Sequence, residues 1–106
     1  MTGVQTCALP ISTPPYAERL NAEIMATALD CRADIRTADY TGTLKAGTTA
    51  VLSAVDAVKA GSVKNVMVCA GDMRIGKAGS AQEEIFGDGA AALLIGDDGV
   101  VAEFAG

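Results

Sequence analysis

The sequence predicts an α/β fold in which a mostly parallel sheet surrounds a buried helix. The segment 44–60 has the apolar spacing of a helix but only a narrow polar edge, so most of its surface is expected to be covered. This helix is preceded by a short extended segment at 35–40 and followed by a short apolar strand at 65–70. Strand, helix and strand at this spacing form a βαβ unit, whose two strands are parallel. Half of the residues are hydrophobic, but the sequence has no Trp and only two Phe and two Tyr, which suits close packing of helices on a sheet.

A helix is predicted before this unit. The prolines of Thr13-Pro14-Pro15 are typical of the opening of a helix, and the threonine is a suitable cap. Leu20, Ile24 and Ala28 then fall four residues apart, which predicts that the helix ends near Asp30.

The elements after the buried helix are predicted from turn residues and apolar runs. Gly61 ends the helix, and the apolar run 65–70 indicates a buried strand. Residues 73–84 are expected to be a polar connection. A glycine turn at 87–89 then leads into a strand over 90–95, and a last strand is predicted over 100–104.

The first eleven residues, MTGVQTCALPI, carry no signal of a structural element. They show no apolar period, Pro10 would interrupt a helix, and the sequence features of a targeting signal are missing. The DNA string ACT GGA GTT CAG ACG TGT GCT CTT CCG ATC T resembles a common sequencing-library adapter, and its translation gives Thr2 to Ile11 without a break. We therefore predict that residues 1–11 are adapter-derived, that Ser12 lies at the junction, and that residues 1–11 take no part in the fold.

The charge and the cysteines exclude several classes of function. A net charge of −5 without a basic cluster argues against a nucleic-acid partner. No apolar run is long enough to cross a bilayer, so we expect a soluble, cytoplasmic protein without a membrane partner. With Cys7 set aside, Cys31 and Cys69 lie far apart, and there is no histidine, so no metal site is predicted. Cys69 lies within an apolar strand and is expected to be hidden, with a raised pKa.

Three motifs in a fixed order give the sequence a family resemblance. KAGT opens the buried helix at 45–48, NVMVCAGD forms the strand at 65–72, and FGDGAA at 86–91 precedes the next strand. This combination resembles the thiolase superfamily of condensing enzymes, and most closely its branch of hydroxymethylglutaryl-CoA synthases and type III ketoacyl synthases. The resemblance implies a partial thiolase-like domain over 12–106, which is the N-terminal half of a layered α/β fold.

The resemblance also implies a mechanism, from which this sequence departs. Family members use a cysteine at the start of the buried helix, where the helix favours the thiolate, to take an acyl group from CoA or acyl carrier protein. The acyl group then condenses with a second thioester. Here the position of that cysteine is Leu44, which cannot be a nucleophile. The family's glutamate falls at about Ser12, and its histidine and asparagine belong to a C-terminal half outside this chain.

Other candidate site residues have both a functional and a structural interpretation. Lys45 is a candidate contact for a CoA phosphate, although solvation alone would explain a lysine there. Asp72 and Arg74 lie beyond the end of a strand, where α/β sheets bind ligands, but a loop-bracing role is favoured. A structural turn, with the Asp side chain bonded to the backbone, is predicted for Gly87, Asp88 and Gly89.

Three interpretations of function stay open. The first is a hydroxymethylglutaryl-CoA synthase-like acyl-CoA condensing enzyme, an acyltransferase, seen as a fragment. It would use an acyl-CoA or acyl carrier protein thioester as substrate, need no other cofactor, and form a homodimer when intact. The alternative is a non-catalytic CoA-binding or scaffold subunit that partners a thiolase, with Leu44 plugging the cavity. The third is an unrelated α/β domain. The chain alone exposes apolar faces and open strand edges, so we expect it to be poorly soluble, self-associating or partly molten.

Overall fold

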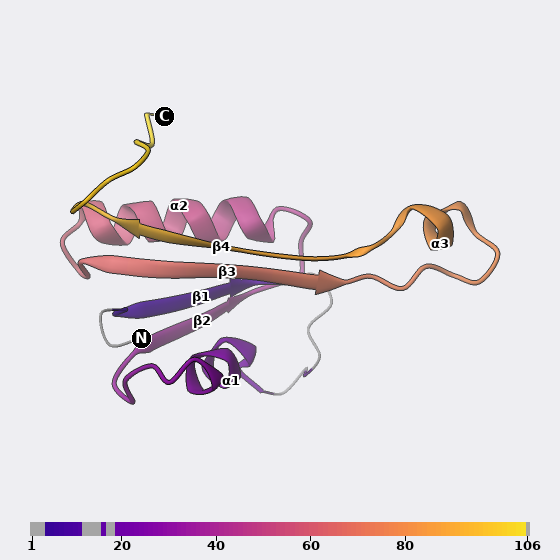
Figure 1. Ribbon diagram of the computed structural model, residues 1–106, viewed down its shortest axis with the longest axis horizontal. Helices are drawn as coiled ribbons and strands as arrows, with labels where there is room; N and C mark the ends of the chain where they lie inside the picture. The colour runs from indigo at the N-terminus through magenta and orange to yellow at the C-terminus, as the bar shows by residue number, and fades with distance from the viewer. Residues whose placement is uncertain (1–3, 12–15, 17–18, 106) are drawn as a thin grey trace.

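The fold is a sheet between two helices, seen in a computed structural model that describes residues 4–11, 16 and 19–105 (Figure 1). Four strands pair in the order β2-β1-β3-β4, with β1 parallel to β2 and β3, and β4 antiparallel to β3. The predicted α/β fold with a mostly parallel sheet is therefore confirmed. In chain order the elements are β1 (Thr6–Pro10), α1 (Asn21–Ala28), β2 (Arg36–Tyr40), α2 (Ala46–Lys59), β3 (Asn65–Met73), α3 (Ala81–Ile85) and β4 (Asp88–Gly96).

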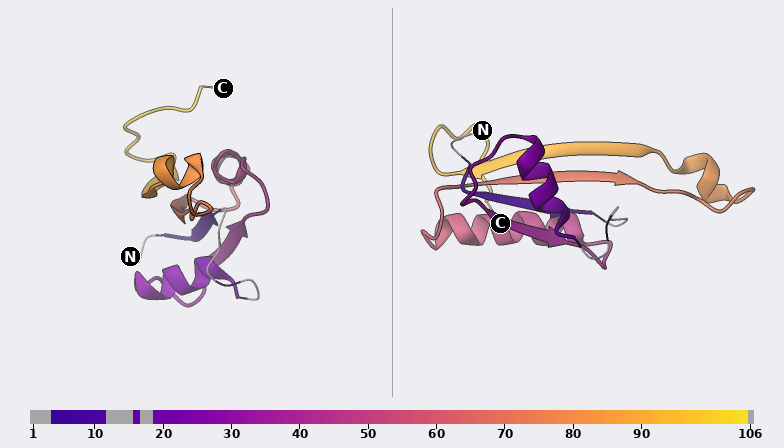
Figure 2. Two further views of the ribbon diagram at one scale, coloured as in Figure 1. Left: turned by 90° about the vertical axis from the view of Figure 1, so that its right-hand side faces the viewer. Right: turned by 90° about the horizontal axis from the view of Figure 1, so that it is seen from below.

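The two longer helices, α1 and α2, cover opposite faces of the sheet (Figure 2). Alternate residues of each strand point to opposite faces, so neighbours in sequence enter different apolar clusters. The cluster under α1 contains Cys7 and Met67, whereas the cluster under α2 contains Ala8 and Val66. The core is thus two thin layers of small and branched side chains.

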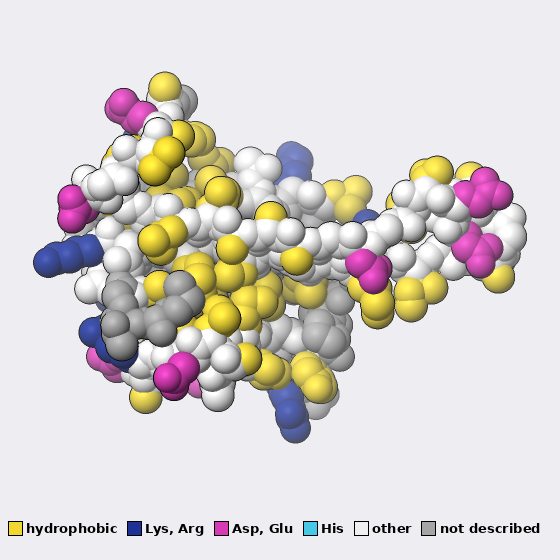
Figure 3. Space-filling model, in the orientation of Figure 1, with side chains coloured by type: hydrophobic (Ala, Val, Ile, Leu, Met, Phe, Trp, Pro, Cys, Tyr) yellow, Lys and Arg dark blue, Asp and Glu magenta, His cyan; other side chains and the backbone are white. Residues whose placement is uncertain are grey.

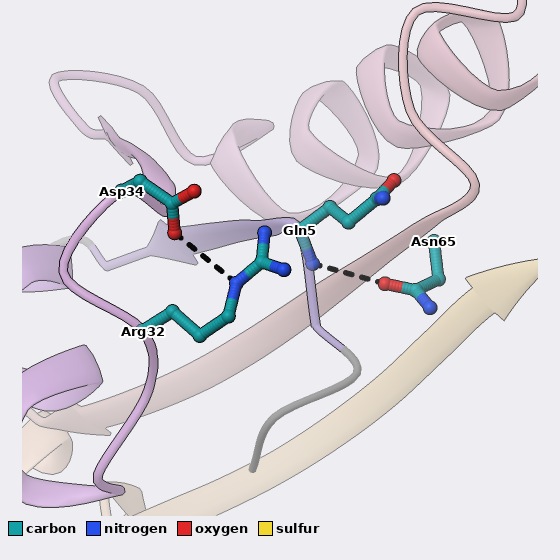
Figure 4. Close-up of polar contacts among 4 residues, drawn as sticks. All are labelled: Gln5, Arg32, Asp34 and Asn65. Atoms are coloured by element: carbon teal, nitrogen blue, oxygen red, sulfur yellow. Dashed lines mark hydrogen bonds and ion pairs between the residues drawn. The ribbon is translucent and has the colours of Figure 1, made fainter.

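The strand β1 corrects the expectation that residues 1–11 take no part in the fold. All five of its residues pair with β2, and Cys7 and Ala8 also pair with β3, so β1 lies inside the sheet. Figure 4 shows the contact that ties its start to β3, in which the Gln5 backbone N–H donates to Asn65 Oδ1 at 3.0 Å. A short central strand needs only a few apolar residues on its two faces, and CALP supplies them. The DNA origin of these residues stays a prediction.

The helix α1 begins later than the sequence predicts, at Asn21. The predicted opening at 13–15 lies outside the described residues. The first turn is capped from another element, because Asp39 of β2 accepts from the backbone N–H groups of Asn21 and Ala22, both at 2.7 Å. The predicted end is confirmed, since the chain leaves the helix through Leu29 and Asp30 has φ 55°.

The helix α2 lies along the sheet and is covered on one face only. Its buried residues are Ala46, Ala50, Ala54 and Val55, whereas Leu52 is 44% exposed. The prediction of a helix over 44–60 is confirmed, with the start two residues later. The expected burial on most sides is wrong for this chain, because the described residues supply only one apolar layer against it.

The connection between β3 and β4 projects beyond the sheet as an arm, defined here as residues 74–87 (Figures 1 and 2). It contains α3, a short helix that the sequence analysis did not predict. Side-chain bonds stabilise the turn before α3: Gly79 N–H donates to Glu83 Oε2 at 2.6 Å, and Ser80 Oγ donates to the Lys77 carbonyl at 2.5 Å. The arm gives the molecule an extent of 48 × 32 × 20 Å.

The C-terminal part differs from the prediction at both ends of β4. This strand begins at Asp88 rather than at 90, since β3 continues to Met73 and provides partners for the extra residues. The strand predicted over 100–104 is not formed, and Val101 is fully exposed. A strand needs a neighbour to bond with, and none lies beside this segment among the described residues.

Candidate functional site

A pocket of about 470 Å³ lies at one edge of the sheet. Because β1 and β3 are parallel, their carboxyl ends meet at this edge, and the antiparallel strand β4 begins there. The segment that connects β2 to α2 also lies at this edge, and the start of α2 forms one side of the pocket. The lining consists of Pro10, Ile11, Thr43, Leu44, Ala46, Gly47, Ala70, Gly71, Asp72, Arg74, Gly89, Ala90 and Ala91.

Small residues keep the pocket open. A Cβ at Gly71 would lie 3.9 Å from the Cβ of Ala90, which is ordinary van der Waals contact. At Gly47 and Gly89 an added Cβ would meet no atom within 4 Å. The space between α2 and the strands is therefore available to a ligand rather than filled by side chains.

Leu44 lies directly before α2 and lines the pocket while 85% exposed. The pocket stays open beside it, so the expectation that Leu44 plugs the cavity is not met. Thr43 holds this segment, since its Oγ1 accepts from Lys45 N–H at 3.2 Å and its carbonyl accepts from Ala46 N–H at 3.3 Å. Position 44 thus adjoins the start of a helix, where backbone N–H groups and the helix dipole favour negative charge.

Lys45 occupies the N-cap position of α2 and is exposed. It is not among the residues that line the pocket in the described part of the chain. The structure therefore places the predicted phosphate contact beside the site rather than in it.

The predicted turn at Gly87, Asp88 and Gly89 is not formed. Asp88 and Gly89 are strand residues, paired with Met73 and Asp72 of β3. The Asp88 side chain therefore does not hold a turn. Gly89 lines the pocket, and Gly87 lies just before the strand.

Asp72 and Arg74 were expected to brace a loop, but both line the pocket. The guanidinium carbon of Arg74 lies 5.2 Å from the centre of the Phe86 ring, which is a cation–π distance. Arg74 follows the end of β3, as predicted, whereas Asp72 is a residue of that strand. Ile11 could not be found from the sequence, because its segment was excluded from the fold.

The described cysteines lie away from this pocket. Cys7 and Cys69 are buried on the α1 side of the sheet. Burial raises the pKa of Cys7 to about 11, and burial also raises the pKa of Cys69, as predicted. Neither thiol can therefore take the place of a nucleophile at position 44.

A second pocket, of about 330 Å³, lies between α1 and the sheet. Its lining is apolar except for Asn21 and Tyr16. The Asn21 amide nitrogen donates to the Tyr16 carbonyl at 3.0 Å and to Asp39 Oδ2 at 2.9 Å. The Asn21 side chain is therefore used in holding the start of α1.

Two kinds of site are not found in the described ranges. Within residues 4–11, 16 and 19–105, no cluster of three or more His, Cys, Asp and Glu side chains is placed to hold a metal ion. No helix in the same ranges has both the length and the hydropathy of a membrane span.

The structure defines a three-layer α/β protein with a pocket at the carboxyl ends of the parallel strands β1 and β3. No protein-family model matches the sequence. The hydroxymethylglutaryl-CoA synthase of Methanocaldococcus jannaschii is 36% identical over 92 residues, which are 87% of this chain and 27% of that protein. The chain thus spans about a quarter of the length of this relative.

Solved structures show the same fold. The structure of MvaS in complex with 3-hydroxy-3-methylglutaryl coenzyme A has a TM-score of 0.80 at 23% identity, over 87% of this chain and 22% of that one. A 3-oxoacyl-(acyl-carrier-protein) synthase III has a TM-score of 0.80 at 19% identity, over 98% of this chain and 30% of that one. In sequence and in fold, the chain resembles members of the thiolase-like superfamily.

Proposed function

We propose that the pocket at the start of α2 binds the acyl thioester of CoA or acyl carrier protein. The chain would be part of a hydroxymethylglutaryl-CoA synthase-like member of the condensing-enzyme family, with Leu44 in place of the nucleophile. One observation carries this proposal: two of the three motifs of the resemblance, KAGT and FGDGAA, are far apart in sequence but border the same pocket. The relative at 36% identity supports the substrate class.

The lining suits a thioester in two ways. The small residues Gly71, Gly89 and Ala90 leave room for an acyl group without polar competition. The start of α2 provides partial positive charge, which stabilises a thioester carbonyl oxygen as negative charge develops on it. The apolar side chain of Leu44 would shield the thioester from water but could not accept the acyl group. In this proposal the chain binds the thioester without becoming acylated.

The second candidate is a non-catalytic subunit that keeps the pocket and supports a thiolase partner. Leu44 favours it, because neither buried thiol can replace the missing nucleophile. Both candidates share the thioester pocket and differ in what the intact protein does with the bound group. A homodimer of the intact protein also belongs to the proposal.

The pocket is tested by restoring a thiol where the proposal places the nucleophile. Leu44→Cys is incubated with acetyl-CoA, and transfer of the acetyl group is followed by intact-protein mass spectrometry. Leu52→Cys is the matched control, because it adds a thiol to the exposed face of the same helix. The unaltered chain measures background transfer to Cys31. A helix start raises the thiolate fraction at neutral pH, so we expect Leu44→Cys to react about tenfold faster than Leu52→Cys.

Equal rates for the two variants would show that position 44 has no thioester bound beside it, which would refute the proposed function. Rapid transfer to Leu44→Cys would show that the pocket still presents a thioester to this position. Adding a thiolase then separates the candidates, since only a scaffold subunit would change the thiolase's activity while Leu44 is in place.

A further inference from the structure

The pocket contains one cation among its described lining residues, and this cation is held in position. Arg74 follows the end of β3 by one residue, and its guanidinium carbon lies 5.2 Å from the centre of the Phe86 ring. The two residues come from opposite ends of the arm. The Phe86 ring therefore limits the positions that the long, flexible side chain of Arg74 could otherwise take in the lining of the pocket.

The rest of the lining is poor in groups that could bind an anion. Among the described lining residues, only Thr43 and Asp72 besides Arg74 have side chains with polar atoms. Asp72 carries negative charge and would repel an anion, so an anionic group would have to lie on the Arg74 side. A guanidinium presents a planar fork of donors, which matches the two oxygens of a carboxylate.

The size of the pocket decides which anion Arg74 can reach. Arg74 and the start of α2 line the same pocket of about 470 Å³, and a sphere of that volume is roughly 10 Å across, so a short acyl group at the start of α2 could extend toward Arg74. The phosphates of CoA are separated from its sulfur by the whole pantetheine arm. If the thioester lies at Leu44, as the proposed function requires, an anion beside Arg74 belongs to the acyl group and not to the carrier.

We propose that Arg74, positioned by Phe86, is a specificity-determining residue that selects acyl thioesters whose acyl group ends in a carboxylate. This inference rests on the proposed function, because it assumes that the thioester lies at the start of α2. It adds a substrate class to that function: short dicarboxylic acyl groups are preferred over neutral acyl groups of the same length.

The test compares two thioesters that differ only at the far end of the acyl chain. Succinyl-CoA ends in a carboxylate and butyryl-CoA in a methyl group, while the carrier is identical. Binding of each to the full chain is measured by isothermal titration calorimetry. We expect succinyl-CoA to bind roughly five- to tenfold more tightly, as a charge-assisted pair at a partly exposed site allows.

Three variants separate recognition from structure. Arg74→Met should abolish the preference for succinyl-CoA and leave butyryl-CoA affinity unchanged. Phe86→Leu keeps the cation and removes the ring, so the preference should shrink without vanishing. Arg32→Met is the matched control, because it removes an exposed arginine that pairs with Asp34 elsewhere on the surface, and the preference should survive. Circular dichroism confirms that each variant is folded.

Each other result overturns the inference. If the affinities of the unaltered chain for the two thioesters differ by less than twofold, Arg74 does not recognise the end of the acyl group. If Arg74→Met lowers the affinity for both thioesters equally, Arg74 contacts the carrier phosphates. The proposed thioester pocket is then retained, but the preference for dicarboxylic acyl groups is not. If neither thioester binds, the proposed function fails together with the inference.

Discussion

Removing the Asp39 carboxylate is expected to destabilise the protein through a helix that lies elsewhere in the sequence. The helix α1 has only eight residues, and a helix of this length is marginal without tertiary support. Its N-cap residue, Leu20, has no side chain that can accept a hydrogen bond. Asp39 supplies the missing acceptor from β2, so Asp39→Ala would leave the first turn without a cap.

The magnitude follows from the three bonds that Asp39 accepts. Two come from backbone N–H groups of the first turn, at Asn21 and Ala22, and loss of such a cap costs about 0.5–2 kcal/mol. The third comes from the amide nitrogen of Asn21, whose residue is only 5% exposed, so its donor would lose a partner inside the protein. We expect a total loss of about 2–3 kcal/mol, and about half of that for Asp39→Asn, which keeps one acceptor.

Urea unfolding followed by circular dichroism measures this loss. The control is Asp34→Ala, since the Arg32–Asp34 pair is exposed and should contribute less than about 0.5 kcal/mol. For a domain of this size, 2–3 kcal/mol corresponds to a fall of about 10–20 °C in Tm. If Asp39→Ala unfolds within 0.5 kcal/mol of Asp34→Ala, the carboxylate does not cap α1 and the reasoning is wrong.

Four further changes test the thiols, the arm, the first turn of α2 and the open sheet edge. The unfolded Cys7 thiol ionises near its ordinary pKa, whereas the folded thiol stays protonated until about pH 11. The free energy of unfolding should therefore fall as pH rises from about 9 to 11. In urea unfolding, the Cys7→Ala chain should lose less stability than the unaltered chain over the same pH range. In Gly76→Ala the new Cβ would lie 2.5 Å from the backbone nitrogen of Glu83, so amide hydrogen exchange in the arm should speed up. Gly47→Ala meets no atom within 4 Å and should instead raise stability by about 0.5–1 kcal/mol. Leu94 is 65% exposed on the edge strand β4, so Leu94→Lys should lower self-association in sedimentation velocity, and unchanged association would place the contact elsewhere.

The central part of the fold could be predicted because it rests on local patterns. The apolar spacing along α2 and the short apolar run of β3 are periodic signals within single segments. Their order also predicts that β2 and β3 point the same way, although β1 lies between them. The rest of the fold was harder to predict, because apolar residues are not confined to the core. Figure 3 shows apolar side chains on the surface, and those of Leu93 and Leu94 in β4 are exposed.

The features that were missed depend on partners distant in sequence. Three apolar residues, Cys7 to Leu9, have no period of their own and become a strand only between β2 and β3. The start of α1 depends on Asp39, which the pattern of the helix itself does not contain. The last predicted strand had the correct composition, but a strand requires a neighbour. At the site, Arg74 reaches the pocket because β3 continues to Met73, which local propensity did not indicate.

Because the arm projects beyond the sheet, a protease could cut the chain there without breaking the sheet. Lys77 is exposed, lies four residues beyond the end of β3 and offers a cleavage site for trypsin. Cleavage there would separate the chain into two polypeptides, but β3 and β4 would remain joined along their whole ladder. The two pieces would therefore stay associated as complementing fragments, and the pocket, whose walls come from both, would keep its shape after the covalent link is lost.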